Sequence, residues 1–295
     1  MKLMQLEHHS EVGRLTHLLL KRPQAAFLNQ DYLDSHWRGF GFEGCPDFKL
    51  AVQEYQAFEA LLQSSVPNIY YLDDTPSTGL DSIYVRDALL ATDRGAVVLR
   101  MGKKQRRSEP RAAADFLSGH HIPVLGEIQA PGCMEGGDLV RFGPRTLAVG
   151  QGYRTNRRGI EQLRAILGDS VTEIRVVPLP HWKGPGDVLH LMSLISPLDL
   201  DLCLVFSPLL PVPFRQWLLD RDIRLIEVAE DEFATMGGNV LAVGPRDCIM
   251  LSGNPRTQGR LEAAGVAVRV YEGRNISRLG AGGPTCLTRP LRREE

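Results

Sequence analysis

The stretch EGGDLVRFGPRTLAVGQGYRTNRRGIEQLRAIL, residues 135–167, has a second copy in MGGNVLAVGPRDCIMLSGNPRTQGRLEAAG, residues 236–265. Both copies contain a GG pair, then Asp or Asn, apolar residues, GPR, an apolar run, Gly, RT and a helix-like tail. The same order of features over roughly thirty residues indicates an internal repeat, and a repeat of this length sets the whole architecture.

One copy of the repeat predicts two strands, a helix and a further strand. LVRFG and TLAVGQ are typical of strands, the GPR between them of a hairpin turn, and RTNRRGIEQLRAIL of an amphipathic helix. EIRVVPL after the first helix and VAVRVYE after the second predict the last strand. Weaker strand–turn–strand copies begin near Asp81 and Asp187, and GGPTCLTRP near the end of the sequence reads as a further opening strand.

The last unit needs partners from elsewhere, because GGPTCLTRP leaves no room for the rest of a repeat. The N-terminal segment GRLTHLLLKRP and the helix-like AVQEYQAFEALLQSS supply what is missing. We therefore predict an α/β fold: one domain over residues 1–295, built as a five-bladed α/β propeller of ββαβ units around a central cavity. Sealing the ring with the two ends of the chain would remove exposed sheet edges.

The composition is that of an ordinary soluble globular protein, with 43% hydrophobic and 23% charged residues. A net charge of −1 without a long basic block argues against nucleic-acid binding. No apolar run approaches the ~20 residues that a membrane helix needs. The N-terminus MKLMQLEHHSEVGR lacks the apolar stretch of a signal peptide, so we expect a cytoplasmic protein.

The five cysteines are too few and too scattered for a disulfide framework, and no two form a CxxC pair. Cys203 and Cys248 lie inside apolar strands, and Cys133 follows Gly in an apolar slot, so we expect structural roles for these three. Cys286 lies in the glycine-rich GGPTC, where a ligand can approach the backbone closely. Buried filler is the alternative for Cys286.

In a propeller, the openings of the units converge on the central cavity. This convergence collects a cysteine, a histidine and several carboxylates: Asp81, Asp87, Glu135, Asp138, His190 and Cys286. A cysteine nucleophile needs a nearby acid/base group, and His190 meets that need. His190 as a buried, hydrogen-bonded core residue is the plainer alternative, and His181, placed in a loop, is its rival for the catalytic role.

The carboxylates point to a cationic ligand. A buried carboxylate such as Glu135 is costly unless it binds a cation or caps backbone amides. A guanidinium is planar and always charged, and it pairs bidentately with carboxylates while presenting its central carbon to a thiolate. Asp138, which follows the GG pair, is counted with the substrate-binding candidates for the same reason.

The motifs EGGD, RTN, VLHL and GGPTCLTRP, in this order, resemble the guanidino-group-modifying enzymes. This superfamily includes arginine deiminase, dimethylarginine dimethylaminohydrolase and the amidinotransferases. The resemblance spans residues 13–290 and implies the five-bladed α/β propeller called the pentein fold. It implies Cys286 as nucleophile, His190 as general acid/base and Glu135 as the carboxylate that holds the guanidinium and orients the histidine.

The resemblance also implies how the substrate is held. Asp87 matches the second guanidinium-binding carboxylate, and Asp81 matches a contact to the amino-acid end of the substrate. Arg154 matches an arginine that binds the α-carboxylate, with Arg100 as a second candidate; a solvated surface arginine is the alternative for both. The implied partner is a small guanidino amino acid, no metal or organic cofactor is implied, and a homodimer is left open.

The resemblance leaves a choice of reaction. Arginine deiminases and amidinotransferases usually carry an aspartate two residues after the histidine, where this sequence has Met192. The missing carboxylate favours a dimethylarginine-type hydrolase that yields citrulline and an amine through a covalent thiouronium intermediate. Arg86 in DSIYVRD is deiminase-like, so arginine deiminase and amidinotransferase stay open. A catalytically silent binding protein of this fold is the non-enzymatic alternative.

The segment FLNQDYLDSHWRGFGFEGC, residues 27–45, is rich in aromatic residues and glycine and has little periodicity. We expect it to form a mobile lid over the mouth of the cavity, with an ordinary packed connection as the alternative.

Overall fold

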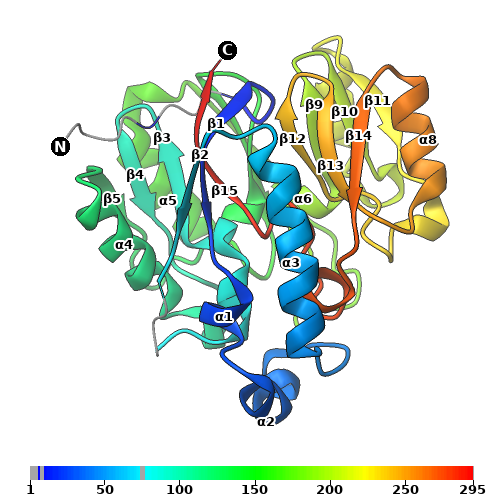
Figure 1. The fold of residues 1–295 in the computed structure, drawn as a ribbon. Helices are drawn as coiled ribbons and strands as arrows, with labels where there is room; N and C mark the ends of the chain where they lie inside the picture. The colour runs from blue at the N-terminus through cyan, green and yellow to red at the C-terminus, as the bar shows by residue number, and fades with distance from the viewer. Residues whose placement is uncertain (1–5, 7–9, 74–76, 295) are drawn as a thin grey trace.

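A computed structural model describes residues 6, 10–73 and 77–294 of the chain. Within these residues fifteen strands form five sheets of three strands each, set around a common centre (Figure 1). The sheets are β15 (Arg289–Glu294), β1 (Arg14–Leu20) and β2 (Asn68–Tyr71); β3 (Leu89–Thr92), β4 (Gly95–Val98) and β5 (Val124–Glu127); β6 (Leu139–Arg141), β7 (Thr146–Gln151) and β8 (Glu173–Pro178); β9 (Ile195–Asp199), β10 (Leu202–Val205) and β11 (Arg224–Glu227); β12 (Val240–Gly244), β13 (Asp247–Leu251) and β14 (Ala267–Tyr271).

Each sheet has the same internal order, with an antiparallel first pair and a parallel second pair. The hairpin pairs β6–β7 and β12–β13 fall on the two strong copies of the repeat, as predicted. In the sheet that joins the chain ends, β15 pairs antiparallel with β1, and β1 pairs parallel with β2. The predicted α/β propeller, and its closure by the two ends of the chain, are therefore confirmed.

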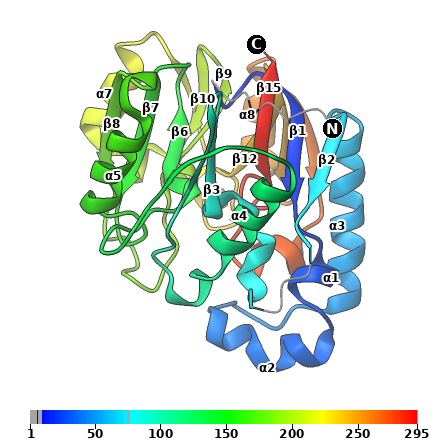
Figure 2. The same cartoon turned by 90° about the vertical axis from the view of Figure 1, so that its left-hand side faces the viewer.

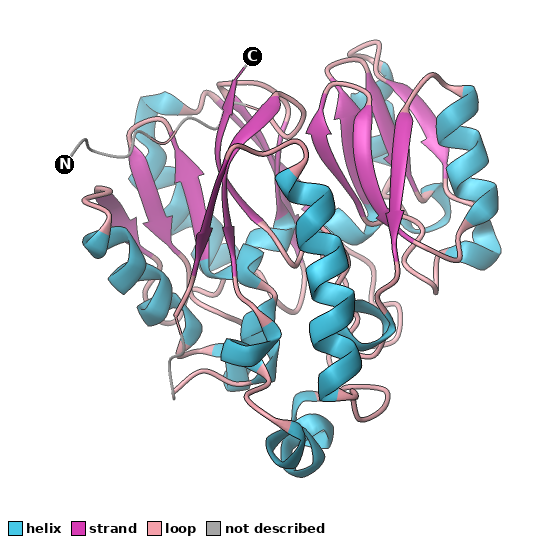
Figure 3. Ribbon diagram, viewed as in Figure 1, coloured by secondary structure: helices cyan, strands magenta, loops and turns pink. Residues whose placement is uncertain are grey.

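A helix connects the second and third strands of each sheet and lies on its outer side (Figure 3). These helices are α3 (Phe48–Gln63), which follows α1 (Pro23–Ala26) and α2 (Gln30–Phe40), and α4 (Glu109–Gly119), α5 (Arg157–Leu167), α7 (Val212–Leu219) and α8 (Pro255–Ala263). The short helix α6 (Leu191–Leu194) instead lies between β8 and β9, which belong to two different sheets. Helix α5 shows why these segments are helical: Asn156 caps its first turn, and Ile160, Leu163 and Leu167 form one buried face. None of the helices in the described part of the chain is long and apolar enough to span a membrane.

The unit openings are tight turns, whereas we had predicted strands. DSIYVRD forms two 3₁₀ turns, η1 (Leu80–Ile83) and η2 (Val85–Ala88), before β3 begins. His190 is the residue that precedes α6, and Cys286 lies in a turn that ends before β15. The predictions of strand for these segments are therefore wrong. A strand alternates its side chains between two faces, so it would direct only every second residue of such a segment toward the cavity.

Polar side chains at the openings stabilise these turns across neighbouring blades. Asp138 and Asn239 occupy the same position after the GG pair of the repeat. Asp138 Oδ1 accepts a hydrogen bond from the Leu191 N–H at 3.0 Å, and Asn239 Oδ1 accepts from the Thr285 N–H at the same distance. In these two copies of the repeat, the Asp or Asn therefore joins its blade to the turn of the next one.

Candidate active site

Helix α2 lies at the end of the molecule opposite the C-terminal end of β15 (Figure 2). A cavity of about 510 Å³ is lined in part by the C-terminal end of this helix. We call it the central cavity. Its lining includes Cys286, His190, Asp87, Asp81 and Arg154, which the chain supplies from different blades. The structure therefore brings together five of the residues predicted from the sequence.

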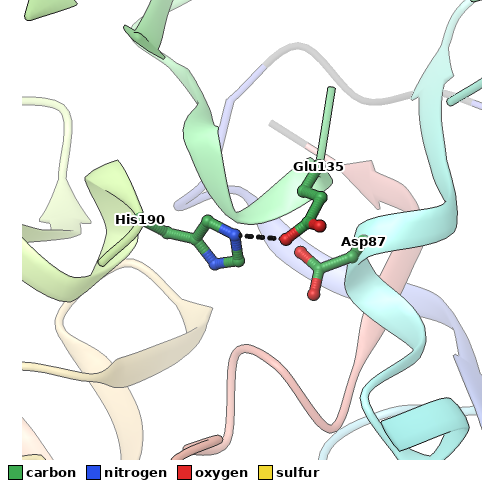
Figure 4. Close-up of side chains that lie close together, drawn as sticks. All are labelled: Asp87, Glu135 and His190. Atoms are coloured by element: carbon green, nitrogen blue, oxygen red, sulfur yellow. Dashed lines mark hydrogen bonds and ion pairs between the residues drawn. The ribbon is translucent and has the colours of Figure 1, made fainter. Parts of the chain in front are cut away.

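Glu135 lies behind this lining as a fully buried carboxylate with several N–H donors. The His190 Nε2–H donates to its Oε2 at 2.7 Å (Figure 4), and Arg154 Nη1 donates to the same oxygen at 3.0 Å. The backbone N–H groups of Gly102 and Lys103 donate to Oε1, each at 3.0 Å. Glu135 therefore fixes the His190 ring with one nitrogen turned toward the carboxylate.

The protonation states of this pair follow from the charges around it. Burial would raise the pKa of Glu135, but the hydrogen bond from His190 and the charges of His190 and Arg154 hold it well below its usual range. Burial would lower the pKa of His190, but the charges of Asp87 and Asp138 and the bond to Glu135 raise it to about 9. At neutral pH the site holds a carboxylate and an imidazolium, which is an acid ready to give a proton.

The two glycines after Glu135 allow this close packing. A Cβ atom at Gly137 would lie 2.4 Å from Nδ1 of His190, and one at Gly136 would lie 2.2 Å from the carbonyl oxygen of Arg86. Any side chain at these positions would displace the histidine ring or the neighbouring turn. Both positions therefore require glycine, because the His190 ring and the turn that carries Asp87 lie directly against the backbone there.

Asp87 is also buried and already faces a cation. Its Oδ2 pairs with Arg106 Nη1 at 2.6 Å, and its Oδ1 accepts from the Gly137 N–H at 2.8 Å. Arg106 is 3% exposed, lines the central cavity and also pairs with Glu109 at 2.8 Å. Sequence reasoning missed Arg106, and the basic run KKQRR at residues 103–107 was the signal that could have found it.

Asp87, Glu135 and His190 offer three donor atoms that all lie within 4.8 Å of one another (Figure 4). Such a group can ligate a metal ion by its donor types. Here each carboxylate already accepts hydrogen bonds from a guanidinium, that of Arg106 on Asp87 and that of Arg154 on Glu135. A metal ion bound here would have to displace both guanidinium groups or lie beside their positive charges. The arrangement therefore favours planar organic cations over a metal ion.

Cys286 is partly exposed to the central cavity. The Sγ of Cys286 accepts a hydrogen bond from Asn239 Nδ2 at 3.7 Å, and the carbonyl oxygen of Cys286 accepts one from the Arg86 N–H at 3.3 Å. Burial, followed by the charge of Asp87, raises the pKa of the thiol, while the hydrogen bond from Thr285 opposes this. The resting thiol is therefore protonated at neutral pH, and a cation bound beside it would favour the thiolate.

The rim of the cavity carries Asp81 and part of the segment at residues 27–45. Asp81 forms an ion pair with Lys103, whose Nζ also donates to the carbonyl of Phe40. Helix α2 occupies much of this segment, in which we found little periodicity; it begins after the cap Asn29 and ends before Gly41, which has a φ of 77°. Its C-terminal end lines the mouth of the cavity, and the mobility of this lid stays a prediction.

Two predicted substrate-binding residues lie outside the lining of the central cavity. Arg100 Nη1 donates to the carbonyl of Gly132 at 3.0 Å and contacts Cys133 Sγ at 3.2 Å. Asp138 is fully buried beneath His190, and burial raises its pKa to about 6. Its bond to the Leu191 N–H places the turn that carries His190, which is a positioning role.

A second, smaller cavity of about 130 Å³ adjoins the central cavity at Cys286 and His190. We call it the side compartment. Its wall combines apolar side chains (Trp182, Val188, Leu189, Phe233 and Met236) with polar and charged ones (Glu43, Lys183, Asp187, Ser193 and Asn239). Met192, which we expected to free space beside the nucleophile, lines neither of these cavities and is buried in the core. The apolar space beside Cys286 therefore comes from other residues.

The raised pKa of His190 makes stability depend on pH. A group whose pKa is higher in the folded than in the unfolded protein stabilises the fold below the unfolded pKa, and that contribution disappears as pH rises through the folded pKa. For His190 the loss is expected between pH 6.5 and about 9. We expect the thermal midpoint of the protein to fall over this range, and to fall less in His190→Gln; equal slopes in both proteins would contradict this pKa.

Comparisons with known proteins agree with the fold. The family model for arginine deiminase matches residues 61–212 and 208–293. The chain is 29% identical to N(G),N(G)-dimethylarginine dimethylaminohydrolase of Pseudomonas aeruginosa, covering 83% of this chain and 90% of that protein. It is also 29% identical to the enzyme of the same name from Streptomyces coelicolor, covering 83% and 88% of the two chains.

A solved structure of the Pseudomonas aeruginosa enzyme, a cysteine-to-serine variant in complex with citrulline, has the same fold. It superposes with a TM-score of 0.75 at 26% identity and covers 94% of this chain and 99% of that one. The ring of sheets, the cysteine, histidine and carboxylates at its centre and the family match point the same way: the chain belongs to the arginine deiminase family of guanidino-group-modifying enzymes.

Proposed function

We propose that this protein hydrolyses the guanidino group of an N-alkylated arginine, giving citrulline and an amine, with Cys286 as the nucleophile. The observation that carries the proposal is that Cys286 and His190 line one cavity whose two buried carboxylates each hold a guanidinium. Arg106 on Asp87 and Arg154 on Glu135 occupy the positions that a substrate guanidinium would take. These carboxylates are therefore suited to the charged head group of such a substrate.

Binding would exchange these ion pairs. The guanidinium of the substrate would pair with Asp87 and Glu135, and the α-carboxylate of the substrate would take up the cations that it displaces. Arg154 and Arg106 both line the cavity and are available for that role, and Asp81 on the rim suits the α-amino group. Each buried charge would then still have a partner of opposite sign. Binding would therefore avoid the free-energy cost of leaving a buried charge unpaired.

The reaction would proceed in two halves. Cys286 Sγ forms a bond to the guanidinium carbon, and the bond from that carbon to the alkylated nitrogen breaks as His190 gives a proton to the leaving amine. A thiouronium stays attached to Cys286. Water then gives a proton to His190 and adds to the same carbon, and the carbon–sulfur bond breaks to release the ureido product and the thiol.

The charges of the site suit this order of steps. His190, with its pKa raised to about 9, is protonated when the amine has to leave. The Cys286 thiol has a raised pKa in the unliganded site, and a bound guanidinium supplies the positive charge that lowers it. The thiol would therefore lose its proton to solvent mainly when substrate is bound, and the released amine, which is a base, takes up a proton from solvent in its place.

The side compartment supports an alkylated leaving nitrogen over an unsubstituted one. It meets the central cavity at Cys286 and His190, where the leaving group departs, and the apolar side chains in its mixed wall offer contacts to methyl groups. Arginine deimination and amidino transfer are the remaining alternatives within the family.

A substrate panel tests the proposal. Arginine, monomethylarginine, asymmetric dimethylarginine and agmatine are offered, and the ureido product and the released amine are both measured. We expect dimethylarginine to give the highest kcat/KM, with one dimethylamine per citrulline, and agmatine to be poor because it lacks the α-carboxylate. Ammonia from arginine as the main product would replace the proposal with deimination, and turnover that requires an added amine would replace it with transfer. A wild-type protein that turns over none of them would favour the binding protein.

A further inference from the structure

Four arginine side chains are buried together in the centre of the ring, behind the turn that holds Cys286. Arg86, Arg289 and Arg293 are each 1% exposed, and Arg141 is 4% exposed. Arg289 and Arg293 belong to β15, where the alternation of side chains turns every second residue inward. Fully buried arginines are rare unless they are paired, so this group requires an explanation.

The described residues supply little negative charge for this group. Glu11 is the buried acid beside it, and its Oε2 lies 3.4 Å from Arg86 Nη1. Asp87, on the other side of Arg86, has Arg106 as its own partner at 2.6 Å. Within residues 10–73 and 77–294 no ion pair reaches Arg141, Arg289 or Arg293. Among the described residues, the centre of the ring therefore has more buried positive than negative charge.

Several of these guanidinium groups also lack hydrogen-bond acceptors among the described residues. Arg293 donates through Nη1 to the carbonyl of Gly13 at 2.7 Å and through Nη2 to that of Ala242 at 2.8 Å, but its buried Nε–H has no partner. Arg289 has no partner for its buried Nε–H or Nη1. A buried donor without an acceptor is destabilising, and more so when it carries charge.

A small space lies beside these groups. Arg86, Arg293, Glu11, Thr285 and Ser196 supply its polar lining, and the rest comes from the residues Met192, Ile195, Pro197, Val240, Leu241 and Ala242. Arg289 lies outside this lining. The space is about 10 Å³, close to what one water molecule or one monatomic ion needs and too little for phosphate or sulfate. The ligand that fits is therefore small and round.

We propose that this space binds a chloride ion, which balances the charge of Arg86 and Arg293 in its lining and of Arg289 nearby, and which accepts the hydrogen bond that the Arg293 Nε–H leaves unmade. Loss of a proton cannot relieve the charge at neutral pH. Burial lowers the pKa of Arg289 to about 9 and that of Arg293 to about 10, so both stay protonated at pH 7. The site is separate from the central cavity and does not depend on the reaction proposed above.

Crystals of the full chain grown in sodium bromide test the occupant directly, because bromide replaces chloride and scatters anomalously. We expect an anomalous peak in the space between Arg86 and Arg293. Absence of a peak there, in crystals that show bromide elsewhere on the surface, would overturn the proposal whatever the behaviour in solution.

Thermal unfolding gives an independent test. At equal ionic strength, we expect chloride to raise the midpoint by a few degrees over gluconate, which is too large for the space. Arg289→Met removes one buried charge without removing a hydrogen bond within the described chain, so its midpoint in gluconate should match or exceed that of the wild type, and its response to chloride should shrink. Arg164→Met, on the exposed face of α5, should keep the full response. Identical midpoints of the wild type in the two salts would overturn the proposal.

Discussion

Cys286→Ser is expected to fold normally and to lose turnover by a factor on the order of 10⁴ or more, because the attacking atom is removed. The side chain makes only long contacts through its sulfur, 3.7 Å to Asn239 Nδ2 and 3.9 Å to Thr285 Oγ1, so a hydroxyl in its place disturbs little. The measurements are kcat with dimethylarginine, the thermal midpoint, and mass spectrometry of the trapped enzyme for a covalent adduct at Cys286.

A matched control separates this effect from the loss of any thiol. Cys133→Ser changes a cysteine that is equally partly exposed but lies outside the central cavity, where Arg100 Nη1 contacts its Sγ at 3.2 Å. A hydroxyl accepts that hydrogen bond, so Cys133→Ser should keep its activity. Retained turnover in Cys286→Ser, or an adduct on another residue, would show that Cys286 is not the nucleophile.

Glu135→Gln should produce the second large effect, a fall in kcat on the order of 10²-fold or more. The amide removes a charge that, after those of Asp87 and Asp138, raises the pKa of His190, and it leaves Arg154 in a buried site without its ionic partner. The variant should also unfold more easily, because breaking one side of a buried ion pair is strongly destabilising. Activity, the unfolding midpoint and the titration of His190 by NMR are measured together.

The titration distinguishes catalysis from mere loss of structure. In the wild type the pKa of His190 is raised to about 9, and in Glu135→Gln it should move back toward its ordinary 6.5. A low kcat with an unmoved His190 titration would mean that Glu135 acts only on the fold. Glu161→Gln is the matched control: it removes a carboxylate paired with two arginines on exposed α5, and it should change neither kcat nor the titration.

Much of the fold could be predicted because the repeat is local. The GG pair, the GPR turn and the tail of the repeat specify strands and a helix within single segments, and β6, β7 and α5 follow them. Helix α2 was missed although its cap Asn29 and its terminal Gly41 were visible, because aromatic residues obscured the helical periodicity. Local signals therefore predict the blades, and capping residues add to what periodicity alone can find.

The openings of the blades were harder, because their conformation is set by partners from other blades. The turn at His190 depends on Asp138, and the turn at Cys286 depends on Asn239. Nothing in VLHLMSLI or GGPTC by itself distinguishes a strand from a turn that another segment stabilises. The tertiary contact overrides the strand propensity of the apolar residues at these positions.

The sequence by itself determined the number of blades, the closure of the ring and the residues that converge on its axis, because a repeat imposes its geometry on every copy. Only the tertiary structure decided how the charges pair: that Arg106 lies on Asp87, that Arg154 lies on Glu135, and that Arg86, Arg289 and Arg293 share a centre with little negative charge. Ion pairs between blades form only where the folded ring brings two charged groups close together. Burial then strengthens the interaction between the charges, because the protein interior screens them less than water does.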